Sequence, residues 1–186
     1  MTHFDSIEDY QGKIKNILVT KEEIEDAVTR AAKAIDALYD GTPILLVSIL
    51  KGAFIFMADV CKEVTVPVEI AFMTAKSYFD DVVSSGTVEI TMDLAQDVSN
   101  YHVVILEDIV DTGRTLAKIV EILKSRGPKS LRVITLLDKP SRRTVDFKAD
   151  MSLFVIPDHF AIGYGLDCGE YYRTLPYIAE YDESKN

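Results

Sequence analysis

The sequence feature that most constrains the fold is a set of short, almost wholly apolar segments separated by helical patterns. Residues 44–50 (ILLVSIL) are the clearest case, because six of the seven are apolar. A strand with one face in water alternates apolar and polar side chains, whereas a strand covered on both faces does not. Residues 103–106, 131–137 and 153–156 have the same character. We therefore predict an α/β fold in which a central, mostly parallel, twisted sheet is flanked by helices.

The segment before residue 44 predicts a long helix. Thr20 and Glu23 have the spacing of a capping box, which marks a helix start. Gly41 and Pro43 predict its end, because glycine adopts the left-handed conformation and proline cannot continue a helix. Between these limits, apolar residues follow at helical spacing: Ile24, Ala27, Val28, Ala31, Ile35 and Leu38.

The length of 186 residues predicts one domain, residues 1–186, at about 150 residues per domain. Two further helices are predicted at residues 53–61 and 116–123, and two further strands at 66–73 and 87–92. Residues 76–86 are predicted to form a long loop. The first 19 residues give no clear assignment.

Composition excludes several classes of protein. Thirty acidic against twenty basic residues, a net charge of −10, disfavour nucleic acid as a partner. Two cysteines cannot build a disulfide scaffold or a four-cysteine zinc site. No apolar run approaches the roughly 20 residues of a membrane span, and the first residues do not resemble a signal peptide. We expect a cytoplasmic protein with no membrane or nucleic-acid partner.

Residues 103–116 carry the clearest functional signal. An apolar strand leads into the carboxylates Glu107 and Asp108, and Asp111 follows three residues later. Thr112, Gly113, Arg114 and Thr115 then open a helix. Backbone N–H groups at a helix start, with nearby hydroxyls, bind anions, and glycine allows a close approach. Ligands of such folds bind beyond the carboxyl ends of the strands, where this segment is expected to lie.

Carboxylates next to a phosphate-binding loop are incompatible unless a cation or sugar hydroxyls lie between them. A hydrated Mg²⁺ or a ribose would satisfy both groups, so the segment indicates a phosphorylated sugar with a metal. The alternative is an acidic helix cap, which stabilises a helix by about 0.3–1 kcal/mol. That alternative accounts for one carboxylate but not for three, together with two threonines and a glycine.

This segment resembles the phosphoribosyl-pyrophosphate (PRPP) signature of type I phosphoribosyltransferases. Over residues 43–177 the chain is also similar to the hypoxanthine-guanine phosphoribosyltransferase family. The resemblance implies transfer of a phosphoribosyl group from PRPP to N9 of hypoxanthine or guanine, with release of pyrophosphate, in purine salvage. The ordered motifs that carry it are 50–52 (LKG), 72–78 (FMTAKSY), 107–115, 136–140 (LLDKP), 156–160 (IPDHF) and 163–167 (GYGLD).

The resemblance implies roles for the PRPP-binding residues. Glu107 and Asp108 would hold the ribose hydroxyls and, with Asp167, support Mg²⁺. Asp111 would be the general base at purine N7, a role that requires proximity because an ordinary aspartate is a weak base. The 5′-phosphate would be bound by Asp111, Thr112, Gly113, Arg114 and Thr115.

The resemblance also implies residues for the other two reactants. Pyrophosphate would be bound by Lys51, Gly52 and Arg173, with a Leu50–Lys51 peptide that is cis in relatives. Lys139 would donate to the purine 6-oxygen and so disfavour adenine. Three further residues would contact the purine: Phe160 by stacking, Ala161 through its backbone and Asp167 at the purine edge. Ser77 and Tyr78 would belong to a loop that closes over the reacting centre.

The family resemblance further implies a small hood over the site, formed by the N-terminal segment and residues 153–186, and a homodimer or homotetramer. His159, where relatives often have Lys or Glu, and Ala161, where Val is usual, leave the choice between hypoxanthine, guanine and xanthine open. Two other functions remain alternatives: a PRPP-sensing regulatory protein that binds nucleic acid, and a phosphoacceptor domain. The acidic charge, Asp111 and Lys139 argue against the first, and the second gives residues 112–115 no role.

Overall fold

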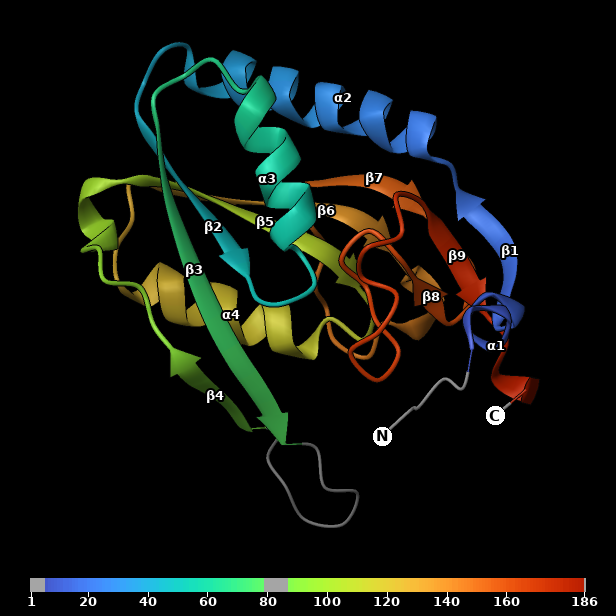
Figure 1. Cartoon of the computed structure of the whole chain (residues 1–186). Coiled ribbons are helices and arrows are strands. Elements are labelled where there is room, and N and C mark those ends of the chain that lie inside the picture. Colours follow the sequence, from blue (N-terminus) through green and yellow to red (C-terminus); the bar gives the residue numbers. More distant parts are fainter. Residues whose placement is uncertain (1–5, 79–86, 186) are drawn as a thin grey trace.

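The computed structural model describes residues 6–78 and 87–185. Its main sheet has six strands in the order β4-β3-β2-β5-β6-β7 (Figure 1). β4 is antiparallel to β3, and the other pairs are parallel. This confirms the predicted α/β class. The strands are β2 (Ile44–Ile49), β3 (Val68–Tyr78), β4 (Thr87–Met92), β5 (His102–Val110), β6 (Ser130–Asp138) and β7 (Met151–Val155).

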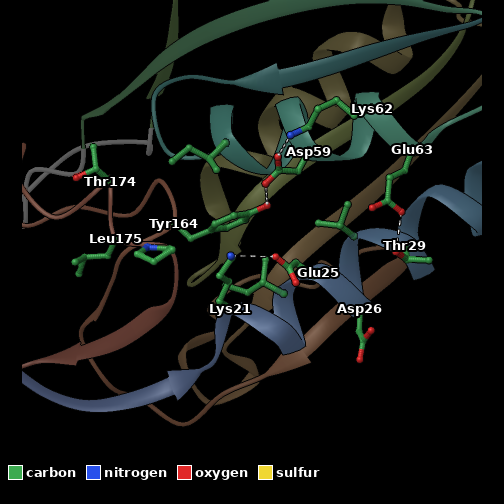
Figure 2. Close-up of a pocket in the computed structure, with 14 residues that line it drawn as sticks. Lys21, Glu25, Asp26, Thr29, Asp59, Lys62, Glu63, Tyr164, Thr174 and Leu175 are labelled. Carbon is green, nitrogen blue, oxygen red and sulfur yellow. Dashed lines mark hydrogen bonds and ion pairs between the residues drawn. The ribbon is translucent and has the colours of Figure 1, made fainter.

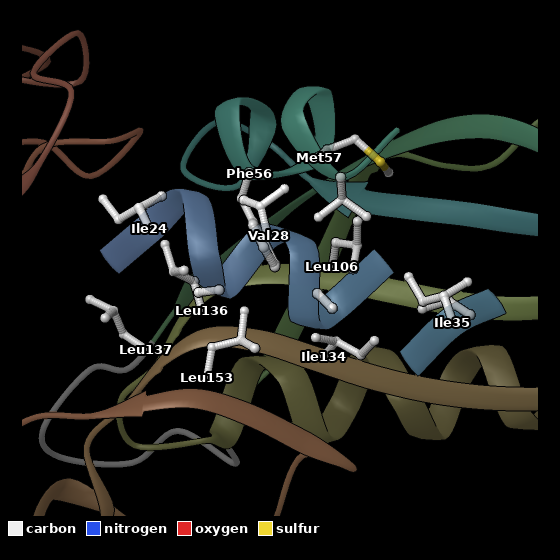
Figure 3. Packing of buried hydrophobic residues seen from close by; sticks show 14 of the residues in the cluster. Ile24, Val28, Ile35, Phe56, Met57, Leu106, Ile134, Leu136, Leu137 and Leu153 are labelled. Atoms are coloured by element: carbon white, nitrogen blue, oxygen red, sulfur yellow. The ribbon is translucent and has the colours of Figure 1, made fainter. Parts of the chain in front are cut away.

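Helices cover both faces of this sheet. α2 (Lys21–Tyr39) and α3 (Phe54–Glu63) lie on one face and α4 (Arg114–Ser125) on the other (Figure 1). All six residues of β2 are buried. Ile44 and Leu46 join the cluster that contains α2 and α3, shown in Figure 3, whereas Leu45 and Val47 join the cluster that contains α4. The continuous apolar run of this strand is therefore explained by two separate cores.

The predicted long helix is confirmed, including its cap. The Thr20 hydroxyl accepts a hydrogen bond from the Glu23 N–H at 3.2 Å, and the Glu23 carboxylate accepts one from the Thr20 N–H at 2.8 Å. The helix ends at Tyr39, and Asp40 takes the left-handed conformation with φ 40°. Leu38, which shares the predicted apolar face, is 54% exposed in the last turn.

Two strands are longer than predicted. β3 continues to Tyr78, so residues 76–78 of the predicted loop are strand instead, because they pair with β4 (Lys76 with Glu89 and Tyr78 with Thr87). Residues 79–86 of that loop lie outside the described residues. β5 continues through Glu107 and Asp108 to Val110, since its pairing with β6 extends to Asp138. The two carboxylates therefore lie within the strand and not after it.

A second, antiparallel sheet joins the two ends of the described chain. Its order is β1-β9-β8, with β1 at Ile14–Val19, β9 at Ile178–Tyr181 and β8 at Ala161–Ile162. The helix α1 (Ile7–Gly12) precedes it, and Tyr172 and Tyr181 belong to its separate core cluster. Short 3₁₀ turns occur at Val98–Asn100, Pro140–Arg142 and Glu183–Lys185. None of the helices in these residues has the length and apolar character needed to cross a membrane.

Candidate active site at the carboxyl ends of the parallel strands

Three of the predicted binding segments begin where neighbouring parallel strands end. Lys51 and Gly52 follow β2, residues 111–113 follow β5, and Lys139 follows β6. Val110 is directly opposite Asp138 in the β5–β6 pairing, and the Lys139 N–H donates to the Val110 carbonyl at 2.9 Å. The predicted phosphate and purine segments therefore lie side by side at one edge of the sheet, as expected for this class of fold.

The loop between β5 and α4 has the geometry of an anion-binding turn. Gly113 is the N-cap of α4 and has φ 80°, which favours glycine. The Arg114 N–H donates to the Thr112 hydroxyl at 3.4 Å. The first amides of a helix have no acceptor within the helix and carry its positive dipole end. The predicted helix start at residues 112–115 is therefore confirmed, and it can receive a phosphate group.

Residues 142–144 support this loop, and sequence reasoning did not identify them. Arg143 donates to both the Asp111 carbonyl and the Asp138 carboxylate. Arg142 Nε donates to Asp111 Oδ1 at 3.2 Å, and the Thr144 N–H donates to the Thr112 carbonyl at 3.1 Å. The sequence offered one signal for this contact, which is that Arg142 and Arg143 are adjacent in an otherwise acidic chain. Nothing in the sequence showed that they lie against residues 111–113.

Glu107 and Asp108 form a partly buried acidic pair at the end of β5. Burial raises the pKa of Glu107 well above its usual value, and the neighbouring Asp108 charge raises it further. Burial also raises the pKa of Asp108 to about 6, although hydrogen bonding and the Arg173 charge oppose this. Glu107 Oε2 is buried without a hydrogen-bond partner in the part of the chain that the structure describes. One oxygen of the acidic pair, Glu107 Oε2, therefore has no donor against it among the described residues.

This pair fits a divalent cation that arrives together with its substrate. Mg²⁺ commonly binds one or two protein carboxylates and takes its other ligands from water and phosphates. Within residues 6–78 and 87–185, no three carboxylate, histidine or cysteine side chains gather as a closed metal site. Asp167, predicted to share the metal, is not brought into such a cluster. Its Oδ1 lies 2.9 Å from Arg173 Nη2, and its Oδ2 accepts from the Glu170 N–H at 2.9 Å.

The predicted pyrophosphate residues lie together. The Leu50–Lys51 peptide is cis, as the family resemblance implied. Lys51 Nζ lies 2.9 Å from Glu170 Oε2, and Arg173 Nη2 lies 3.2 Å from the same oxygen. The hydrogen bond from Lys51 is the largest cause of the lowered pKa of Glu170. Glu170 was not predicted, and it takes the left-handed conformation with φ 75°.

Gly52 packs closely against the acidic pair and the 163–167 segment. A Cβ at Gly52 would lie 1.6 Å from Asp108 Oδ2, and a Cβ at Gly165 would lie 1.9 Å from the Gly52 carbonyl oxygen. Gly165, which has φ 102° and meets backbone, requires glycine, whereas a side chain at Gly52 would displace the Asp108 carboxylate. Arg173 joins the same group, since its Nη1 donates to the Gly165 carbonyl at 2.8 Å. The predicted pyrophosphate and ribose residues therefore form one packed unit.

The predicted purine residues come from two places: Lys139 follows β6 of the main sheet, whereas Phe160 and Ala161 lie at the start of β8 in the small sheet. Lys139 is only 6% exposed, and its Nζ lies 4.0 Å from Asp158 Oδ1, so it is not a surface lysine. Phe160 is 41% exposed, and its ring centroid lies 5.7 Å from that of Tyr181. Ala161 begins β8. A buried ammonium suits an acceptor oxygen of a ligand, and an exposed aromatic ring suits stacking on a planar one.

Ser77 and Tyr78 form the last two residues of β3 and pair with β4. Their side chains are outside the described part of the structure, as are residues 79–86. Their predicted part in a closing loop therefore stays a prediction.

Residues 16–168 match the family model described as phosphoribosyl transferase domain. Because the match covers more than half of the chain, the chain belongs to this family.

Individual similar proteins show which type of phosphoribosyltransferase the chain resembles. The chain is 45% identical over 166 residues to hypoxanthine phosphoribosyltransferase of Salmonella typhimurium, covering 88% of this chain and 93% of that protein. A solved hypoxanthine phosphoribosyltransferase of Staphylococcus aureus matches with TM-score 0.89, 40% identity and 96% coverage of each chain. A hypoxanthine-guanine enzyme of Bacillus anthracis matches with TM-score 0.83 and 38% identity, covering 90% of this chain and 97% of that one. The chain thus falls among the hypoxanthine phosphoribosyltransferases, which confirms the resemblance seen in its motifs.

Proposed function

We propose that this chain transfers the 5-phosphoribosyl group of PRPP to N9 of hypoxanthine or guanine, giving IMP or GMP and pyrophosphate, in purine salvage. The single observation that carries the proposal is the edge where β2, β5 and β6 end. There a helix start suited to phosphate, a partly buried acidic pair and a buried lysine lie next to one another. Each suits a different part of the two substrates.

The β5–α4 loop would hold the 5′-phosphate, through its backbone amides and the hydroxyls of Thr112 and Thr115. Glu107 and Asp108 would accept hydrogen bonds from the ribose hydroxyls and hold Mg²⁺. The cation would neutralise charge on the departing pyrophosphate. Positive charge that develops on the ribose carbon resembles that of glycoside cleavage, so nearby carboxylates stabilise it.

Lys139 would donate to the purine 6-oxygen. An amino group at that position would leave the buried ammonium facing another donor, which strongly disfavours adenine. Phe160 would stack on the ring, with Ala161 contacting it through its backbone and Asp167 lying near its edge. Asp111 would accept the N7 proton as the bond to N9 forms. The Asp111 carboxylate accepts a hydrogen bond from Arg142 Nε at 3.2 Å.

Lys51, Gly52 and Arg173 would bind pyrophosphate, and Ser77 and Tyr78 would help to exclude water from the reacting centre. We also propose that the β1-β9-β8 sheet and the residues between β7 and β9 act as a hood within a single domain, residues 1–186. This proposal is supported by the contact of Gly165 with Gly52 and by the hydrogen bond from Arg173 to Gly165.

A homodimer or homotetramer is proposed on the basis of one apolar face. Phe54, Ile70 and Phe72 are 40%, 43% and 40% exposed, and Phe54 and Phe72 line a depression beside Lys51. Exposed apolar patches commonly mark protein interfaces. Sedimentation of the protein and of the Phe54→Ser/Phe72→Ser double variant tests this. The variant should be monomeric, and an unchanged assembly would place the interface elsewhere.

The activity itself is tested by mixing the protein with PRPP, Mg²⁺ and each of hypoxanthine, guanine, xanthine and adenine, and by following nucleotide formation. We expect IMP or GMP, dependence on Mg²⁺ and little AMP. Turnover of adenine alone would contradict the role of Lys139. Tight binding of RNA or DNA at moderate salt, without turnover, would favour the regulatory alternative.

A further inference from the structure

Tyr164 makes a partly buried hydrogen bond that none of the proposed roles uses. The side chain is 5% exposed, and its hydroxyl donates to Asp59 Oδ2 of α3 at 2.7 Å. The pair forms part of the wall of a cavity of about 640 Å³ between α2, α3 and residues 174–176 (Figure 2). This cavity contains none of the proposed substrate-binding residues. The bond therefore involves none of the residues proposed to bind substrate.

The two partners are linked through the chain to one point in the site. Asp59 lies on α3, the helix that begins two residues after Gly52. Tyr164 directly precedes Gly165, whose Cα packs against the Gly52 carbonyl. The Tyr164–Asp59 bond thus closes a ring of contacts: Gly52, α3, Asp59, Tyr164, Gly165 and Gly52 again. A change at the bond alters how the two glycine segments meet.

Arg173 is attached to the same ring. The Gly165 N–H donates to the Arg173 carbonyl at 2.9 Å, and Arg173 Nη1 donates back to the Gly165 carbonyl at 2.8 Å. Tyr164 has φ 50°, a left-handed conformation that costs a non-glycine residue free energy. The hydroxyl bond to Asp59 offsets that cost. Without it the turn can relax, and Gly165 and Arg173 would move with it.

We infer that the Tyr164–Asp59 hydrogen bond is a positioning device for the pyrophosphate half of the site. Tyr164 and Asp59 touch neither substrate. They hold Arg173 and the Lys51–Gly52 segment in place, and so set the affinity for PRPP and pyrophosphate. Lys139, the proposed donor to the purine 6-oxygen, follows β6 and lies on no segment of this ring, so the affinity for the purine should change less than that for PRPP. This inference rests on the proposed function.

The test uses Tyr164→Phe, which removes the hydroxyl alone. We expect the KM for PRPP, and the Kd for pyrophosphate measured by calorimetry with Mg²⁺, to rise about three- to tenfold, the range of one net hydrogen bond. The KM for hypoxanthine and kcat should change less than twofold. Asp59→Ala, at a partly exposed site, should give the same result and serves if the tyrosine variant does not fold. Asp59 Oδ1 also pairs with Lys62 Nζ at 2.5 Å, but this is a largely exposed pair within α3. Since the bond to Tyr164 is the link between Asp59 and the site, the KM for PRPP of the double variant should be no worse than that of either single variant.

Tyr101→Phe is the matched control. Its hydroxyl donates to Glu69 Oε2 at 2.7 Å, also a tyrosine–carboxylate bond, and Tyr101 directly precedes β5, at the opposite end of that strand from the site. It should lower the melting temperature by a similar amount and leave the KM for PRPP unchanged. Additive effects in the double variant, equal rises in both substrate KM values, or an unchanged pyrophosphate Kd would overturn the inference. If the wild-type protein formed no nucleotide, but Tyr164→Phe still raised the Kd for pyrophosphate, the proposed function would be contradicted and the inference would not.

Discussion

Replacing Gly52 with alanine should abolish most of the activity while leaving the fold intact. The added Cβ would lie 1.6 Å from Asp108 Oδ2 and 2.6 Å from its Cγ, whereas real Cβ contacts are not closer than 3.0 Å. The carboxylate must therefore move by at least about 1.4 Å, the difference between 3.0 and 1.6 Å. Gly52 is not among the residues with positive φ, so its backbone accepts alanine without strain. The obstructing atoms belong to a side chain, which can turn away.

A misplacement of about 1 Å in a group that positions substrate can cost about 10²-fold in rate. We therefore expect kcat/KM for PRPP to fall by about 10²-fold or more in Gly52→Ala. The melting temperature should fall by only a few degrees, because no core residue changes. The measurement is IMP formation from hypoxanthine and PRPP, together with thermal unfolding followed by circular dichroism.

Gly12→Ala is the control, since a Cβ at Gly12 would meet no atom within 4 Å and this residue too lacks a positive φ. Its kcat/KM should equal that of the wild type. If Gly52→Ala kept kcat/KM within threefold of the wild type, the placement of Asp108 against Gly52, or its part in binding PRPP, would be wrong.

Three further predictions concern individual side chains. Lys139→Gln should lower the ratio of kcat/KM for hypoxanthine to that for adenine at least tenfold, because an amide can also accept a hydrogen bond; an unchanged ratio would remove Lys139 from purine selection. Asp111→Asn should lower kcat about 10²- to 10⁴-fold with PRPP affinity nearly unchanged, as single-turnover and binding measurements would reveal; unaltered kcat would exclude the base role. Asp93 accepts two hydrogen bonds from Arg126, at 2.8 and 2.6 Å, and these hold its pKa below the usual 3.8. A lowered folded-state pKa contributes stability above pH 3.8 that is lost as the pH falls below it. Asp93→Asn should therefore destabilise the protein by less than about 1 kcal/mol at pH 7 and still less near pH 3, by urea unfolding; a constant difference would refute this.

The parts of the fold that could be predicted are those set by local pattern. The Thr20–Glu23 capping box and the apolar face after it lie within one helix, so neighbouring residues carry the whole signal. The two-sided burial of β2 follows from its own composition. The helix start at Gly113 likewise depends on adjacent residues. The family resemblance added the order of the motifs and the roles they imply.

The features that could not be predicted depend on contacts between distant segments. β5 extends past its apolar run because β6 supplies partners for Glu107 and Val110. Arg143 supports the Asp111 carbonyl from 32 residues away. Glu170 joins Lys51 to Arg173 across 119 residues of sequence. The sequence around Arg143 and Glu170 is like that around ordinary surface residues, so only the folded structure reveals their contacts.

The pairing of β9 between β1 and β8 has a consequence for synthesis of the protein. Ile14 pairs with Tyr181, and Ala161 pairs with Glu180, so the strand that begins with Ala161 is held by one made near residue 180. A nascent chain can assemble β2, β5, β6 and their helices while this strand is still inside the ribosome. Competence to bind a nucleobase would then arise only after the main sheet has formed.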